Sequence, residues 1–120
     1  EPRYLRAWYR LGLVQGKQGK LDKAAATLEK TLGLARGKNR ALLLCDLGKI
    51  QRKQGKLKAA LKSYAAAIKA NPEHYKAHLL MGLAHASAKK CKKAKASFRR
   101  FIKGTKAPDS VLKELMKKCK

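Results

Sequence analysis

The chain repeats itself, and this repetition constrains its fold more than any other feature of the sequence. The segment KQGKL occupies residues 17–21 and returns unchanged at residues 53–57. The Leu-Gly pair at 11–12 returns 36 residues later at 47–48, and as Met-Gly at 81–82 after a further 34 residues. Self-similarity at a period of about 20–50 residues is the signature of a repeat array. The sequence therefore predicts three successive copies of one structural unit.

Each copy is predicted to be a pair of α-helices. Alanine, leucine and lysine dominate the chain, and all three are good helix formers. Alternating β-branched residues, which would indicate strands, are absent from the sequence. The fold class is therefore predicted to be all-α. The expected helix pairs span about residues 3–17 and 21–34, 39–53 and 57–70, and 74–88 and 91–104.

One glycine falls near the middle of the first helix of every pair, at Gly12, Gly48 and Gly82. A glycine in a helix interior costs up to about 1 kcal/mol relative to alanine. Its recurrence indicates that another helix passes close by at that point. We expect the matching small surface to come from the alanines that follow each glycine by 12 residues. These are Ala24, Ala60 and Ala94.

The helix ends also have sequence signals. Gly19 and Gly55 are predicted to form the turns between paired helices. Asn71 and Pro72 are predicted to be an N-cap and the first helical residue of the fifth helix. Residues 108–120 are predicted to form a last helix that covers the open end of the array. Its apolar stripe consists of Val111, Leu112, Leu115, Met116 and Cys119.

This pattern resembles the tetratricopeptide repeat over about residues 1–108. The second repeat matches best, through Leu44, Leu47, Gly48, Gln51, Ala60, Tyr64, Ala67 and Pro72. The resemblance implies one domain over residues 1–120, folded as a right-handed solenoid of antiparallel helix pairs. The repeats are expected at about 5–38, 41–74 and 75–108, with a capping helix at about 108–120. Pro2 stands where a proline closes a preceding repeat, so we expect a piece of a longer array.

The resemblance also implies a non-enzymatic scaffold that binds a protein or peptide partner in a concave groove. The residues expected to line this groove are Arg6, Tyr9, Leu13, Cys45, Asp46, Lys49, Arg52, Lys76, Leu79, Leu80 and Leu83. One subfamily clamps C-terminal carboxylates with Lys, Asn, Asn, Lys and Arg at five places, and only Lys76 matches here. The remaining mixture of apolar and basic residues suits a peptide with apolar anchors and acidic flanks.

The charge of the chain leaves a second function open. Thirty-one Lys and Arg against 7 Asp and Glu give a net charge of +24. This excess indicates binding of nucleic acid or another polyanion, charge that keeps a helical scaffold soluble, or an engineered supercharged repeat protein. Lysine outnumbers arginine and aromatic residues are few, which disfavours base stacking as the mode of binding.

No enzyme, metal or cofactor site is predicted. His74 and His78 are four residues apart, but suitably spaced cysteine or carboxylate partners for zinc are missing. The seven acids do not pair as an acid–base couple, and Cys45 has no histidine near it in the repeat register. The glycines lie singly, so no phosphate-binding loop is present.

The cysteines and the apolar runs of the sequence give expectations about the cellular compartment of the protein. Cys45, Cys91 and Cys119 are an odd number without paired spacing, which argues against a disulfide scaffold and favours a reducing, cytoplasmic setting. Cys91 and Cys119 are expected to be packing residues. No signal-peptide pattern occurs, and no apolar run approaches the roughly 18 residues of a membrane span.

The net charge predicts that salt stabilises the fold. With +24 on a small chain, repulsion among lysines and arginines opposes compaction. Raising sodium chloride from near zero to about 0.3 M shortens the Debye length to below about 10 Å and screens this repulsion. The melting temperature followed by circular dichroism should therefore rise over that range. A flat or falling melting temperature would mean that the basic residues are already compensated.

Overall fold

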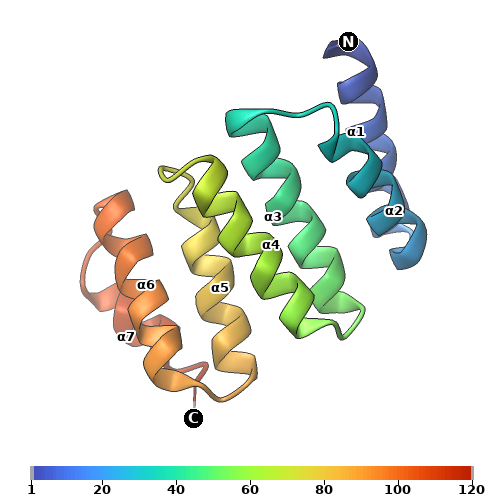
Figure 1. Ribbon diagram of the computed structural model, residues 1–120. Helices are drawn as coiled ribbons and strands as arrows, with labels where there is room; N and C mark the ends of the chain where they lie inside the picture. The colour runs from blue at the N-terminus through green and yellow to red at the C-terminus, as the bar shows by residue number, and fades with distance from the viewer. Residues whose placement is uncertain (1, 120) are drawn as a thin grey trace.

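The computed structural model describes residues 2–119, and their side chains from residue 4 onward. These residues form seven α-helices and no strand, which confirms the all-α prediction (Figure 1). The helices are α1 (Pro2–Lys17), α2 (Leu21–Leu32), α3 (Gly37–Lys53), α4 (Leu57–Ala70), α5 (Lys76–Ser87), α6 (Cys91–Thr105) and α7 (Ser110–Met116).

The helices are arranged as an elongated array rather than around one centre. Each helix contacts the next one along the chain, and α3 also contacts α1 and α5. Figure 1 shows the helices following one another from α1 and α2 at one end to α6 and α7 at the other. The principal extents are 42 × 27 × 19 Å. Contacts between neighbouring units are what hold a solenoid together.

The expected glycine contact is present, but its partner differs from the prediction. The glycines face the large residue that follows each expected alanine by four positions, which is Leu28, Tyr64 or Phe98. A Cβ atom added to Gly12 would lie 2.8 Å from Leu28 Cδ2. At Gly48 and Gly82 the added atom would overlap the rings of Tyr64 and Phe98. The missing side chain makes room for a large residue, so the alanines are not the surface that the glycine meets.

The turns between paired helices contain the predicted glycines in the first two repeats and a lysine in the third. Gly19 and Gly55 adopt left-handed backbone angles, with φ of +80° and +81°. Lys89 occupies the equivalent place in the third repeat, 34 residues after Gly55, with φ of 61°. A left-handed conformation is costly for residues other than glycine. The third turn therefore keeps the backbone geometry of the first two without their favourable residue.

The N-cap prediction at Asn71 was wrong. The Asn71 Oδ1 atom accepts a hydrogen bond from the Glu73 N–H at 3.2 Å, and its carbonyl accepts one from the His74 N–H at 3.0 Å. These bonds close a turn, and helix α5 begins only at Lys76, with Tyr75 at its N-cap position. The Asn-Pro pair in the sequence predicted the start of a helix. It could not show that the chain first makes a turn and enters α5 only afterwards.

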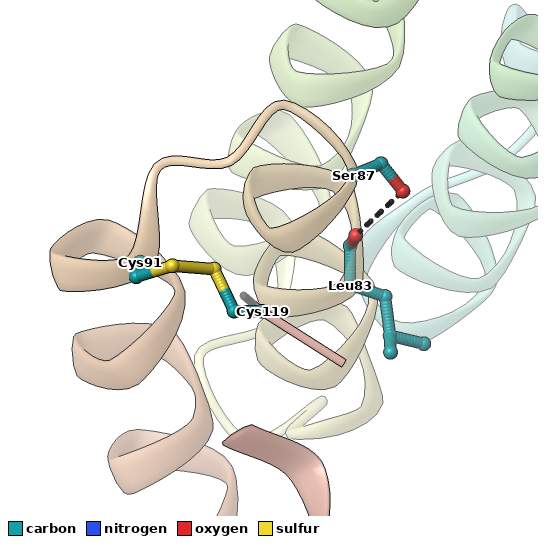
Figure 2. Close-up of a disulfide and its surroundings, with 4 residues drawn as sticks. All are labelled: Leu83, Ser87, Cys91 and Cys119. Atoms are coloured by element: carbon teal, nitrogen blue, oxygen red, sulfur yellow. Dashed lines mark hydrogen bonds between the residues drawn. A yellow bond between two sulfur atoms is a disulfide. The ribbon is translucent and has the colours of Figure 1, made fainter. Parts of the chain in front are cut away.

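A disulfide joins Cys91 and Cys119, contrary to our prediction that these cysteines are unpaired packing residues. Their Cα atoms are 5.7 Å apart across a separation of 28 residues. Figure 2 shows the bond beside Ser87, whose hydroxyl donates to the Leu83 carbonyl at 3.1 Å. Helix α7 packs on α6, and this return of the chain brings the two cysteines together. We expected a reducing compartment because the cysteines appeared to be unpaired. Among the described residues only Cys45 is free, so the cysteines no longer support that expectation.

Helix α7 covers the last helix pair. Three of its apolar residues, together with Cys119, pack against the buried cluster of Ala86, Ala94 and Phe98. They are Leu112, Leu115 and Met116. This contact shields Phe98, which is 0% exposed, from solvent. The disulfide thus fastens the far end of the covering segment to the start of α6.

Gly48→Ala should destabilise the protein by about 1–3 kcal/mol, because the added methyl group overlaps the buried Tyr64 ring. Gly33→Ala is the matched control, since Gly33 is exposed and has αR angles at the end of α2. The control should be neutral or stabilising by up to about 1 kcal/mol. Urea unfolding measures both changes. Equal free energies of unfolding for the two variants would refute the close contact.

Cys119→Ser should lower the free energy of unfolding by about 2–4 kcal/mol under oxidising conditions, because the disulfide no longer restricts the unfolded chain. Adding a reductant should bring the wild-type chain down to the level of the variant. If the two chains unfold together under oxidising conditions, the disulfide does not form in solution.

Candidate functional site

The candidate site lies on the layer formed by α1, α3 and α5. These first helices of the three pairs contact one another in order, α1 with α3 and α3 with α5. All the residues expected to line a groove lie on these helices. In the structure, some of these residues line one of two hollows. Others form a polar contact between the hollows, and the rest lie elsewhere.

The first hollow lies between α1 and α3 and has a volume of about 490 Å³. It brings together three of the expected groove residues, Arg6, Tyr9 and Leu13. The remaining lining residues are Leu5, Arg10, Asn39, Leu42 and Leu43. Leucine side chains with two arginines make this hollow both apolar and basic. The α3 side of the hollow was missed, although Leu42 lies one repeat period of 36 residues after Arg6, which predicts the same helix face for both.

The second hollow lies further along α3 and has a volume of about 410 Å³. It brings together the expected residues Lys49, Arg52 and Leu80. Lys53 and Tyr64, which the sequence reasoning missed, complete the lining. Tyr64 belongs to α4, the second helix of its pair, so a search restricted to first helices could not find it.

A group of polar residues, Tyr9 of α1 with Asp46 and Lys49 of α3, links the two hollows, and we call it the polar bridge. The Tyr9 hydroxyl donates a hydrogen bond to Asp46 Oδ2 at 2.5 Å, and Lys49 Nζ lies 3.7 Å from Asp46 Oδ1. Burial raises the pKa of Tyr9, and the hydrogen bond to Asp46 raises it further. The phenol therefore keeps its proton and remains a donor. Asp46 is thus held by a neutral donor on one side and a cation on the other.

Besides Asp46, four expected groove residues lie outside the two hollows. Cys45 is 2% exposed and belongs to the core of the second repeat. Leu79 and Leu83 pack against the Phe98 cluster, the same cluster that α7 covers. Lys76 is exposed at the start of α5 and lines neither hollow. Helical register identified the face of each helix, but the depth of a side chain depends on its neighbours.

The chemistry of Cys45 is that of a buried thiol. Burial raises the pKa of Cys45 to about 12. The negative charge of Asp46 also raises this pKa, whereas the positive charges of Lys49 and Lys76 lower it. A cysteine acts as a nucleophile through its thiolate, which this environment disfavours.

The histidines also lie in packed surroundings. His78 and His85 are 8% and 9% exposed, and burial lowers the pKa of both imidazoles. Within residues 2–119, no group of three or more His, Cys, Asp and Glu side chains is placed to hold a metal ion. None of the described helices is both long and apolar enough to cross a membrane.

Comparison with known proteins places this geometry in a family. Two family models, both described as tetratricopeptide repeat, match residues 3–73 and 45–111. Among similar solved structures is the first TPR of Spaghetti (RPAP3) bound to the HSP90 peptide SRMEEVD. It is 20% identical with a TM-score of 0.80, and the match covers 98% of this chain and 92% of that one.

Two bacterial chaperone complexes are similar as well. PcrH from Pseudomonas aeruginosa, in complex with the chaperone binding region of PopB, is 19% identical with a TM-score of 0.81, covering 99% and 94%. The type III secretion chaperone SycD from Yersinia enterocolitica, in complex with a peptide of the translocator YopD, is 13% identical with a TM-score of 0.83, covering 96% and 91%. At these identities the likeness concerns the fold. A search of curated proteins finds no match in sequence.

Cys45 should be unreactive in the folded protein. With a pKa of about 12, only about one thiol in ten thousand is ionised at pH 8, and the side chain is buried. Ellman's reagent under non-reducing conditions should therefore detect this thiol only after the chain is unfolded. Rapid labelling of Cys45 in the native chain would show that the second repeat opens readily.

Proposed function

The chain belongs to the tetratricopeptide repeat family, and on this basis we propose that it is a non-enzymatic scaffold whose inner face binds a peptide segment of a protein partner. The similar structures of Spaghetti, PcrH and SycD each hold a peptide or a partner's binding region. The proposed peptide carries apolar anchors and acidic flanks.

The first hollow is the observation that carries this proposal. Leu13, Leu42 and Leu43 offer an apolar floor, while Arg6 and Arg10 offer two cations at the same place. An apolar side chain of a bound segment would lose its water against the leucines, at about 25 cal/mol for each Å² buried. Carboxylates beside that anchor would receive charge-assisted hydrogen bonds from the arginines. The hollow therefore suits a leucine-like anchor with a neighbouring Asp or Glu.

The polar bridge determines how such a peptide is arranged. Asp46 sits between the hollows, so a peptide carboxylate directly above it would be repelled. Basic side chains stand on either side, with Arg6 in the first hollow and Arg52 and Lys53 in the second. We therefore expect acids at both ends of the bound segment and a neutral centre over the Tyr9–Asp46 pair. This arrangement differs from a clamp for one C-terminal carboxylate.

A second candidate function rests on the outer helices. The exposed residues of α6 include six cations, which are Lys92, Lys93, Lys95, Arg99, Arg100 and Lys103. Three basic residues, Arg99, Lys103 and Lys106, also line a hollow of about 650 Å³ next to α7. Binding of nucleic acid or another polyanion to this surface would be non-specific and would weaken steeply with salt.

Two charge reversals separate the candidates, because each changes the net charge equally. Arg6→Glu alters the first hollow, whereas Lys62→Glu alters an exposed position on α4 that lines none of the hollows described above. The probe is a fluorescein-labelled peptide with two leucines flanked by glutamates. Arg6→Glu should weaken its binding by about tenfold or more, which corresponds to about 1.4 kcal/mol. Lys62→Glu should change the affinity by less than about twofold.

Fluorescence anisotropy measures the peptide affinity, and the same variants are then titrated with heparin. Equal losses of peptide affinity in both variants would refute the groove and leave the electrostatic function. Heparin should respond equally to both variants, because it senses net charge rather than the hollow.

A further inference from the structure

The second hollow of the inner face contains a hydrogen-bond donor that no described residue satisfies. Tyr64 lines this hollow, and its hydroxyl is buried without a hydrogen-bond partner among residues 2–119. Burial raises the pKa of Tyr64 to about 12, although the nearby Arg52 guanidinium lowers it, so the phenol keeps its proton at neutral pH. Arginine offers donors and no acceptor, and therefore cannot take this proton. A buried polar group without a partner costs stability and calls for an explanation.

The first hollow differs from the second in this respect. Its tyrosine, Tyr9, donates to Asp46 Oδ2 at 2.5 Å, so the proton of this phenol already has an acceptor. Asp46 is engaged by Tyr9 and by Lys49, and neither contact leaves it available to Tyr64. The two hollows are therefore suited to different groups of a bound segment.

Three cations line the same hollow as the unsatisfied hydroxyl. They are Lys49, Arg52 and Lys53, near the C-terminal end of α3. Lys49 pairs with Asp46, whereas in the described part of the chain neither Arg52 nor Lys53 forms an ion pair with a carboxylate. The second hollow thus combines two uncompensated positive charges with a neutral hydroxyl donor.

The contact that holds Arg52 is weak enough for its side chain to move onto a ligand. Arg52 is partly exposed, and its guanidinium donates to Ser87 Oγ at the end of α5. Ser87 gives its own proton to the Leu83 carbonyl at 3.1 Å (Figure 2). The Arg52–Ser87 distance of 3.4 Å is long for an N–H···O bond, which is usually about 2.9 Å. An anion in the hollow can therefore draw the guanidinium toward itself and reach the phenol beside it.

The number of donors decides which anion fits this hollow best. A carboxylate has two oxygens and one negative charge, whereas a phosphate monoester has three terminal oxygens and about two negative charges at neutral pH. The planar guanidinium of Arg52 can bind two phosphate oxygens at once. The third oxygen then accepts the proton of the Tyr64 hydroxyl, and Lys53 balances the remaining charge. A carboxylate would leave one of these donors unused.

We propose that the second hollow binds the phosphate of a phosphorylated residue in the peptide segment that the inner face holds. This inference rests on the proposed peptide-binding function and adds regulation to it. Phosphorylation replaces a neutral hydroxyl of the segment by a group that meets Arg52, Lys53 and Tyr64. Leu80 lines the same hollow and packs against the apolar atoms next to the phosphate.

The test compares a phosphate with the same charge in another form. The probe is a fluorescein-labelled peptide with two leucines, in which one acidic flank is phosphoserine. The charge-matched peptide carries two glutamates at that place. Both are made with this flank before or after the leucines, because a segment can span the two hollows in either direction. In one direction, fluorescence anisotropy should show binding of phosphoserine about tenfold or more tighter than that of the glutamate pair.

Two conservative variants locate the phosphate. Tyr64→Phe removes only the hydroxyl and keeps the ring that packs against Gly48, so the melting temperature should be unchanged or higher. Arg52→Lys keeps the positive charge and removes the planar fork. Each variant should reduce the preference for phosphoserine to about threefold or less.

Two controls make the same substitutions away from the hollow. Tyr75→Phe removes the hydroxyl of a tyrosine whose ring lies against Gly104, and Arg36→Lys changes an exposed residue at the start of α3. Neither position lines the first or the second hollow. Both control variants should keep the full preference for phosphoserine.

Three results would overturn this inference alone. Equal affinity for phosphoserine and the glutamate pair in both directions, with binding retained, would refute the phosphate site and leave the proposed groove standing. A full preference that persists in Tyr64→Phe and in Arg52→Lys would mean that these donors do not hold the phosphate. Inorganic phosphate that abolishes the preference below about 1 mM would make the free ion the ligand. Absence of binding by every peptide would instead refute the proposed function together with the phosphate site.

Discussion

The close approach of a mid-helix glycine to a large buried side chain is the contact on which the rest of the array depends. Gly48 faces Tyr64 and Gly82 faces Phe98, while the first pair uses Leu28. A ring that fits where a side chain is missing leaves no void and fixes how the two helices of a pair cross. Each repeat then presents its first helix to the next in the same way, and the inner layer of α1, α3 and α5 results.

Electrostatics works against this packing and in favour of binding. Within the described part of the chain, carboxylates pair with lysines in two places, Asp46 with Lys49 and Glu114 with Lys117. Most of the +24 net charge is therefore uncompensated by the chain itself. Acidic partners lower this self-repulsion wherever they bind. Shape rather than charge must then select among them, and the two inner hollows combine cations with apolar side chains on the layer of first helices.

Much of this architecture could be predicted from the sequence because repeats reveal register. The expected bounds of α4, residues 57–70, agree with the structure, and α6 differs by one residue at its end. Features that depend on three-dimensional neighbours were missed. Cys91 and Cys119 pair only because α7 folds back on α6, and spacing cannot show that. Cys45 lies on the expected layer, yet packing of the adjacent helices buries it.

Methyl-resolved NMR during titration with the acidic, leucine-containing peptide tests the central claim most directly, because it maps contact residue by residue. Binding on the inner face predicts that methyl signals of Leu13 and Leu42 in the first hollow, and of Leu80 in the second, shift together and saturate. The signals of Leu34, which is 50% exposed beyond the end of α2, should stay in place. Shifts confined to methyl groups of the outer helices, with Leu13 and Leu42 unmoved, would contradict the account.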